Sequence, residues 1–135
     1  MANERRALAT KLAAYPIFAD CGAADIEALV TAGATFSLPA GWPLVQEGIP
    51  ADSCYVLVEG TARVFHQREQ IAELGPGDLI GEMALLGGGQ RRATVTSSAR
   101  VQGLRIDNSK LAPLLAERPA LAAAFRAVYV AHSGS

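Results

Sequence analysis

The sequence predicts a mainly β fold, a sandwich or roll, with helices at both ends of the chain. From Phe36 onward, short segments of β-forming residues are separated by turn signals such as Pro39-Ala-Gly41 and Gly75-Pro-Gly77. On both sides of that region, apolar residues recur at helical spacing instead. We therefore expect a single domain over 1–135, with N-terminal helices in 1–33, strands in 34–106 and C-terminal helices in 107–132.

Two helices are predicted in the N-terminal region. Leu8 and Leu12 are four residues apart in an alanine-rich segment over 4–14, and the pair Tyr15-Pro16 ends this helix. Capping candidates at 20–22 precede a second helix, and Gly33 is a suitable stop signal. The apolar face of the second helix is formed by Ile26, Leu29 and Val30.

Eight strands are predicted between the turn signals. In the third, Cys54, Val56 and Val58 alternate with Tyr55 and Leu57, so both faces are apolar. A strand of this kind is covered on both sides, which places it in the middle of a sheet. The eight predicted strands cover residues 34–38, 43–47, 53–59, 61–66, 70–74, 78–80, 92–98 and 101–106.

The C-terminal region again has helical spacing. Leu111, Leu114 and Leu115 lie on one side of a first helix, for which Asp107, Asn108 or Ser109 can serve as the cap. A second helix begins at Pro119. Its apolar stripe, expected to pack on the strands, consists of Leu121, Phe125, Val128 and His132.

Charge and hydropathy exclude several classes of protein. The formal net charge of −1 gives no long-range attraction to nucleic acid, so we expect no nucleic-acid binding by this chain alone. No apolar run approaches the roughly 18 residues of a membrane helix. The start Met1-Ala-Asn-Glu-Arg-Arg lacks the apolar segment of a signal peptide. A soluble domain in the cytoplasm is therefore expected.

Neither a metal site nor a catalytic centre is predicted. Cys21 and Cys54 are isolated and suit small core or surface positions, while His66 and His132 have no neighbours with metal-ligand spacing. The sequence has no nucleophile–base pair and no P-loop. We expect neither enzyme activity nor a cofactor.

The segment Gly81-Glu-Met-Ala-Leu-Leu-Gly-Gly-Gly-Gln-Arg-Arg-Ala-Thr94 carries the functional signal. Residues 82–86 favour about one helical turn, whose unpaired N–H groups attract an anion. Arg91 or Arg92 can bring a guanidinium to the same anion, while Glu82 is an acceptor suited to a hydroxyl. The expected ligand has a phosphate next to a sugar hydroxyl.

This segment resembles the phosphate-binding cassette of cyclic-nucleotide-binding domains, which occur in bacterial transcription regulators, kinase regulatory subunits and ion channels. The matching residues are Gly81-Glu82-x-Ala84-Leu85 and Arg91-x-Ala93-Thr94-Val95. The resemblance implies an eight-stranded β-roll of the jelly-roll or double-stranded β-helix type, with a short helix in the cassette. It implies that Glu82 accepts the ribose 2′-hydroxyl and that Arg91 holds the cyclic phosphate. The other implied cassette positions are Gly81 and Thr94, with the backbone N–H groups of Met83, Ala84, Arg92 and Ala93.

The sequence departs from the family at Arg92, where Ala, Ser or Thr is usual. A second cation there could strengthen phosphate binding, block the base or point away, and the sequence leaves all three open. Two other interpretations of the cassette also remain: a surface ion pair between Glu82 and Arg91, and a domain that keeps the motif without binding a nucleotide.

The resemblance also implies where the base lies. It points to Val64 and Ala72, and more loosely to Phe65, as contacts of the base, although packing within the fold is an equally good interpretation. Arg126 occupies a place similar to that of a base-capping residue in channel-type domains; a solvated helix-face arginine is the alternative. In many members the C-terminal helix moves onto the base as a lid.

We accordingly expect a sensor of cAMP, with cGMP as the alternative, that controls a fused or separate effector such as a channel or a kinase. The leading helix over 4–16 and the Phe125-Arg126 ending resemble those of bacterial cyclic-nucleotide-gated channels. The sensor part of a truncated Crp-type transcription regulator is a second interpretation, and a degenerate domain used for protein contact is a third. Leu8 and Leu12 could pack internally or across a homodimer.

Overall fold

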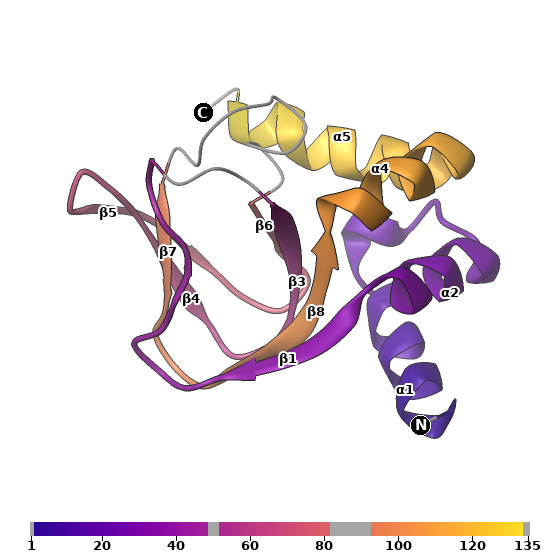
Figure 1. Ribbon diagram of the computed structural model, residues 1–135, viewed down its shortest axis with the longest axis horizontal. Helices are drawn as coiled ribbons and strands as arrows, with labels where there is room; N and C mark the ends of the chain where they lie inside the picture. The colour runs from indigo at the N-terminus through magenta and orange to yellow at the C-terminus, as the bar shows by residue number, and fades with distance from the viewer. Residues whose placement is uncertain (1, 49–51, 82–92, 134–135) are drawn as a thin grey trace.

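The computed structural model describes residues 2–48, 52–81 and 93–133 and consists of two four-stranded sheets with helices beside one of them (Figure 1). All strand pairs are antiparallel. The first sheet has the order β1-β8-β3-β6 and the second the order β2-β7-β4-β5. The strands are β1 (Ala34–Leu38), β2 (Pro43–Val45), β3 (Ser53–Glu59), β4 (Ala62–His66), β5 (Glu69–Leu74), β6 (Leu79–Ile80), β7 (Thr94–Ser97) and β8 (Val101–Asp107).

The predicted eight-stranded β-roll with flanking helices is confirmed, and each predicted strand is present with ends shifted by a few residues at most. The largest shift among strands that are described throughout is in β2, which ends at Val45 instead of residue 47. Its continuation leaves the ladder because the backbone N–H of Glu47 donates to the side-chain hydroxyl of Thr94. The short helix predicted at 82–86 lies outside the described residues.

The β3 strand supplies side chains to two separate hydrophobic cores, as its doubly apolar pattern predicts. It lies between β8 and β6 in the first sheet. Cys54, Val56 and Val58 belong to the core between this sheet and the helices, here called the outer core. Leu57 and Tyr55 belong to the core between the two sheets, here called the inner core. The inner core thus holds the two sheets of the roll together.

The helices are α1 (Ala2–Ala13), α2 (Ala23–Ala32), α4 (Asn108–Glu117) and α5 (Pro119–Ser133), with a 3₁₀ turn at Pro16–Phe18. The 3₁₀ turn follows Tyr15 because the proline there cannot continue α1. At the start of α2, the Asp25 carboxylate accepts the backbone N–H of Gly22 at 2.9 Å, which satisfies one of the otherwise unpaired N–H groups. Leu12, Ile26, Leu29 and Val30 then fill the outer core.

The C-terminal helices pack on the same outer core. Leu121 and Phe125 are both fully buried there, and Val128 packs against them, so these three members of the predicted α5 stripe pack as expected. Leu111 and Leu114 add the buried face of α4. In Figure 1 the described helices α1, α2, α4 and α5 lie beside the β1-β8-β3-β6 sheet, on the side away from the β2-β7-β4-β5 sheet. The α5 helix is therefore attached to the roll through the outer core.

Candidate functional site

The two ends of the predicted cassette lie on different sheets. Gly81 follows directly on β6, an edge strand of the first sheet, and Thr94 begins β7 in the second sheet. Gly81 has φ +88°, a left-handed conformation that side-chain-bearing residues rarely adopt. A residue with a side chain would therefore be strained at this position, directly after β6. The segment with the motif connects one sheet of the roll to the other.

The central cassette residues lie outside the described part of the chain. These residues are Glu82, Met83, Ala84, Arg91 and Arg92, and their roles remain predictions. Ala93 is half-buried in a bend just before β7.

Thr94, at the start of β7, is connected through Glu47 to two other segments of the chain. Its hydroxyl accepts the backbone N–H of Glu47 at 3.0 Å. Glu47 in turn accepts the backbone N–H of Gln67, in the turn between β4 and β5, at 3.1 Å, and its second carboxylate oxygen lies 3.7 Å from His66 Nδ1. The start of β7 is thereby fixed to the end of β2 and to the β4–β5 turn. Sequence reasoning missed Glu47 because its partners are far away along the chain.

Val64 and Ala72, predicted contacts of the base, face each other across β4 and β5. Directly opposed residues of an antiparallel pair point to the same face. Val64 is half-buried and packs against the inner core, and it also lies opposite the buried Val95. Ala72 is exposed on the same face. The structure thus brings Val64 and Ala72 together on the inner face of the second sheet, while Phe65 falls on its other face.

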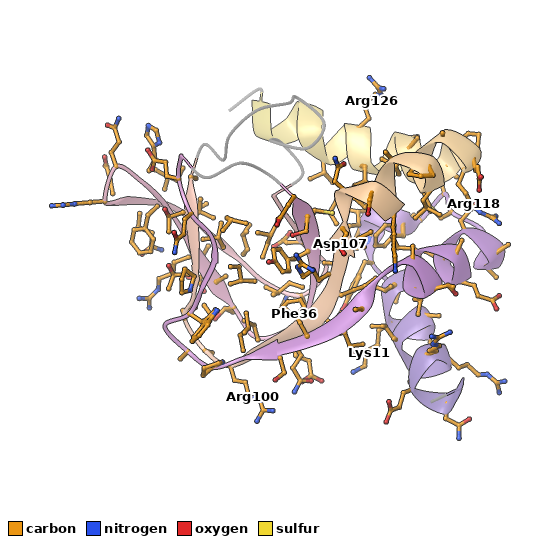
Figure 2. The ribbon with its side chains drawn as sticks, in the orientation of Figure 1. Lys11, Phe36, Arg100, Asp107, Arg118 and Arg126 are labelled. Atoms are coloured by element: carbon orange, nitrogen blue, oxygen red, sulfur yellow. The ribbon has the colours of Figure 1, made fainter. Side chains whose placement is uncertain are left out.

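Arg126 is exposed on α5 and points away from the roll (Figure 2). The same helix directs Phe125 into the outer core. The structure therefore does not bring Arg126 to Val64 and Ala72, and base capping by this residue stays a prediction.

The strands also position a charged group that the sequence did not reveal. Arg105 of β8 lies opposite Tyr55 of β3, and Tyr55 contacts the inner core and the ring of Phe36, with ring centroids 5.2 Å apart. The guanidinium of Arg105 lies 2.7 Å from Asp107 Oδ1 and 4.0 Å from Asp52 Oδ2. A hydrogen bond with Tyr55 is the main cause that raises the pKa of Arg105, and Asp107 and Asp52 raise it further. We call Asp52, Tyr55, Arg105 and Asp107 the β8 rim cluster.

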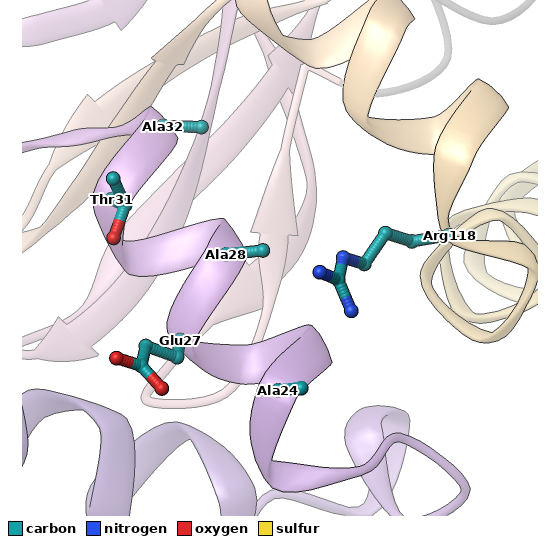
Figure 3. A pocket seen from close by; sticks show the side chains of 6 residues that line it. All are labelled: Ala24, Glu27, Ala28, Thr31, Ala32 and Arg118. Carbon is teal, nitrogen blue, oxygen red and sulfur yellow. The ribbon is translucent and has the colours of Figure 1, made fainter.

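A shallow hollow of about 390 Å³ lies between α2 and the end of α4 (Figure 3). Arg118 points into it, and its Nη1 lies 3.3 Å from the Asp25 carboxylate. Its other lining residues belong to α2 and are mostly alanines: Ala24, Glu27, Ala28, Thr31 and Ala32. This hollow does not include any residue of the predicted nucleotide site.

The described ranges 2–48, 52–81 and 93–133 contain neither a candidate metal site nor a candidate membrane span. No group of three or more His, Cys, Asp or Glu side chains there is arranged to hold a metal ion. None of the helices in those ranges has the length and hydropathy needed to cross a membrane. Cys54 is fully buried in the outer core and Cys21 packs against it, in line with their predicted roles as packing residues.

Comparison with known proteins adds independent evidence. Residues 35–118 match the family model described as the cyclic nucleotide-binding domain. Over 124 residues the chain is 33% identical to a cyclic nucleotide-gated potassium channel of Mesorhizobium japonicum, which covers 92% of this chain and 34% of the channel. Over 113 residues it is 27% identical to a CRP-like cAMP-activated global transcriptional regulator of Mycobacterium tuberculosis, covering 80% of this chain and 50% of the regulator.

The fold is also found among solved structures. The regulatory domain of Toxoplasma gondii PKA, crystallised with cAMP, superimposes with a TM-score of 0.87 at 18% sequence identity, covering 99% of this chain and 51% of that one. At this identity the likeness establishes the fold. The chain spans a third to a half of the length of the potassium channel and of the transcriptional regulator described above.

Proposed function

The chain belongs to the cyclic nucleotide-binding domain family, and from that premise we propose that it senses a cyclic nucleotide, cAMP in the first instance, and controls an effector. The observation that carries the proposal is the position of the motif within the fold. The segment that holds Glu82 and Arg91 leaves β6 at Gly81 and re-enters the roll at Thr94, so it links the two sheets whose inner faces enclose the inner core.

In this proposal Arg91 holds the cyclic phosphate and Glu82 accepts the ribose 2′-hydroxyl. Backbone N–H groups of the cassette supply further donors to the phosphate. An arginine fork can give two charge-assisted hydrogen bonds to phosphate oxygens, whereas an ionised glutamate only accepts hydrogen bonds and therefore suits a hydroxyl. Val64 and Ala72, which share the inner face of the second sheet, support a base contact on that side.

The proposed output is a change in the C-terminal helices. A ligand shifts a conformational equilibrium only if it binds one state more tightly, and a tenfold preference corresponds to about 1.4 kcal/mol. Burial of Leu121 and Phe125 attaches α5 to the outer core in the structure described here. Closure onto the nucleotide would move the exposed face of α5, including Arg126.

We propose 1–135 as one sensor domain, located in the cytoplasm and connected to an effector such as a channel or kinase. The similarity over most of this chain to a bacterial potassium channel favours the channel. A second candidate, the sensor part of a transcription regulator, is supported by the similarity to the CRP-like protein. Expression of the full-length parent protein, followed by assays of ion flux and of DNA binding with and without cAMP, separates the two.

Isothermal titration calorimetry with cAMP and cGMP tests the binding site. We expect saturable binding by the wild type and a loss of about 100-fold or more in Arg91→Ala, since removal of a two-bond arginine clamp costs roughly 3 kcal/mol. Glu82→Ala should lose less. Arg100→Ala is the matched control, because Arg100 is an exposed arginine at the far end of the roll that donates to Ser37. Unchanged affinity in Arg91→Ala would refute the phosphate site, and no binding by the wild type would favour the degenerate alternative.

A further inference from the structure

Each described sheet ends in two edge strands, and three of these four edges have features that hinder pairing with another chain. The β5 edge has two glutamates, Glu69 and Glu73, and an irregular register with β4. The β2 edge is three residues long, begins with Pro43 and is also irregular. The β6 edge has only two residues. Charges, prolines, bulges and short length are the usual means by which natural proteins protect sheet edges.

The β1 edge has none of these features. Its five residues, Ala34–Leu38, include no charged residue and no proline, and they pair with β8 in one uninterrupted register. Among the described strands, β8 is the only neighbour of β1. One side of the β1 backbone therefore presents N–H and C=O groups that no described strand pairs. An unprotected edge of this kind is a template for a further extended strand.

The side chains of β1 alternate between the two faces of the sheet. Phe36 and Leu38 point inward and pack against the inner core, where the ring of Phe36 meets that of Tyr55 in a T-shaped contact. Thr35 and Ser37 point to the other face and are exposed. The β1 edge is thus apolar on one face and carries two hydroxyl groups on the other.

We propose that the β1 edge pairs with the β1 edge of a second copy of this chain, antiparallel and with Phe36 opposite Phe36 of the second copy. In this register Thr35 lies opposite Ser37 of the second copy, and Ala34 lies opposite its Leu38. Each pair thus joins groups of the same kind: two aromatic rings, two hydroxyls or two apolar side chains. Aromatic and hydroxyl pairs across strands stabilise a sheet, and no like charges meet in this arrangement.

Three features favour a second copy as the occupant of this edge. The Ser37 hydroxyl accepts the Nε–H of Arg100 at 3.2 Å, so its own O–H is available to Thr35 of the second copy. The α2 helix directly precedes β1, so antiparallel pairing places the two α2 helices at opposite ends of the paired strands (Figure 1). The other dimer surface predicted from the sequence is used within the chain, because Leu12 is fully buried in the outer core and Leu8 packs against it.

The pairing would join the first sheets of the two copies into one continuous sheet. Its helices would lie on one face of that sheet, since a two-fold axis perpendicular to a sheet keeps each face on its own side. A ladder of five residues buries less than about 1,200 Å², the range of weak and transient complexes. We therefore expect a dissociation constant of roughly 0.1–1 mM. The inference does not depend on nucleotide binding.

Sedimentation equilibrium of the whole chain between about 10 μM and 2 mM tests the pairing. The wild type should dimerise in the upper part of this range. Thr35→Lys/Ser37→Lys places lysine opposite lysine twice in the proposed register and should weaken dimerisation by about fivefold or more. Thr35→Lys/Ser37→Glu places lysine opposite glutamate twice and should dimerise at least as strongly as the wild type.

The matched control adds the same charge to a different edge. Gln70→Lys/Ile71→Lys changes two exposed residues of β5 and should dimerise like the wild type. Circular dichroism and thermal unfolding establish that each variant is folded. Backbone amide NMR shifts give a second measurement: with rising concentration they should change over 34–38 and stay constant over 69–74.

Three outcomes overturn the inference. A folded wild type that stays monomeric up to about 2 mM excludes the dimer and leaves the β1 edge to a strand of a different protein. Equal weakening by the lysine pairs on β1 and on β5 excludes the β1 edge as the interface. A Thr35→Lys/Ser37→Glu variant that dimerises as weakly as Thr35→Lys/Ser37→Lys excludes the register about Phe36.

Discussion

Asp25 Oδ1 lies 3.3 Å from Nη1 of Arg118, and this contact joins the start of α2 to the end of α4. The other carboxylate oxygen of Asp25 accepts the backbone N–H of Gly22. One side chain thus caps a helix and connects the N-terminal helices to the C-terminal ones. Any movement of α4 away from α2 would break the ion pair.

Asp25→Ala should destabilise the fold by about 1–2 kcal/mol, since a lost cap hydrogen bond costs about 1 kcal/mol and a partly exposed ion pair about 0–1 kcal/mol. Asp25→Asn keeps an acceptor for Gly22 and should cost roughly half as much. Urea denaturation followed by circular dichroism measures both. Glu27→Ala, on the exposed face of the same helix, is the control; equal losses at Asp25 and Glu27 would contradict the expectation.

Gly103 lies where β8 passes close to β3. A Cβ at this position would come 2.1 Å from the carbonyl oxygen of Val56, a backbone atom that cannot move aside. Gly103→Ala should therefore destabilise the fold by about 3 kcal/mol or more, or prevent folding. Gly75→Ala, where a Cβ would meet nothing within 4 Å, should stay within about 0.5 kcal/mol of the wild type. Thermal unfolding of Gly103→Ala and Gly75→Ala measures both effects. A well-folded, stable Gly103→Ala protein would contradict the expectation and show that β3 and β8 can separate locally.

Phe125 and Arg126 are neighbours on α5 with opposite environments. Phe125 is 0% exposed in the outer core, so Phe125→Ala should cost about 3–5 kcal/mol. Arg126→Ala should change stability by less than about 0.5 kcal/mol. Denaturant unfolding at equilibrium gives both values. A small loss in Phe125→Ala would mean that α5 is only weakly attached to the roll.

Tyr15 makes the stability depend on pH in the alkaline range. Burial, and next the charge of Glu59, raise the pKa of Tyr15 above its usual value of 10.0. Because the folded state holds the proton more tightly than the unfolded chain, the contribution to stability is complete below about pH 10 and is lost as pH rises through the raised pKa. We expect unfolding titrations between about pH 9 and pH 11.5 to show a shallower decline in Tyr15→Phe than in the wild type. Parallel declines would mean that Tyr15 titrates alike in both states.

Ala72 offers a direct test of the base-facing side of the proposed site. Its side chain is exposed and lies on the same face as Val64, so Ala72→Glu adds a negative charge there with little effect on packing. If the nucleotide binds against this face, its affinity should fall by about fivefold or more through charge repulsion. Gln70→Glu adds the same charge to β5 opposite Phe65, on the other face of the sheet, and should have a smaller effect. Equal effects in calorimetric titrations with cAMP would place the base elsewhere.

The elements of the fold could be predicted because their signals are local. The turn residues around Gly41 and Gly75–Gly77 and the doubly apolar segment 53–59 determined the strands and the central place of β3. The spacing of Leu121 and Phe125 likewise determined the buried face of α5. The ends of β2 and β7 were less accurate, since the N–H of Glu47 bonds to the side chain of Thr94, 47 residues away, instead of to a strand neighbour.

For the candidate site, too, the sequence determined some features and the tertiary structure decided the others. The sequence by itself determined the family, the β-roll and the segment 81–94 that carries the motif, because the residues of the motif are contiguous in the chain. Only the tertiary structure decided that Val64 and Ala72 share the inner face, that Arg105 lies between Tyr55 and Asp107 there, and that Asp25 meets Arg118, 93 residues away. These relations depend on strand register and helix packing, and many side chains of similar character compete for such positions until the whole chain has folded.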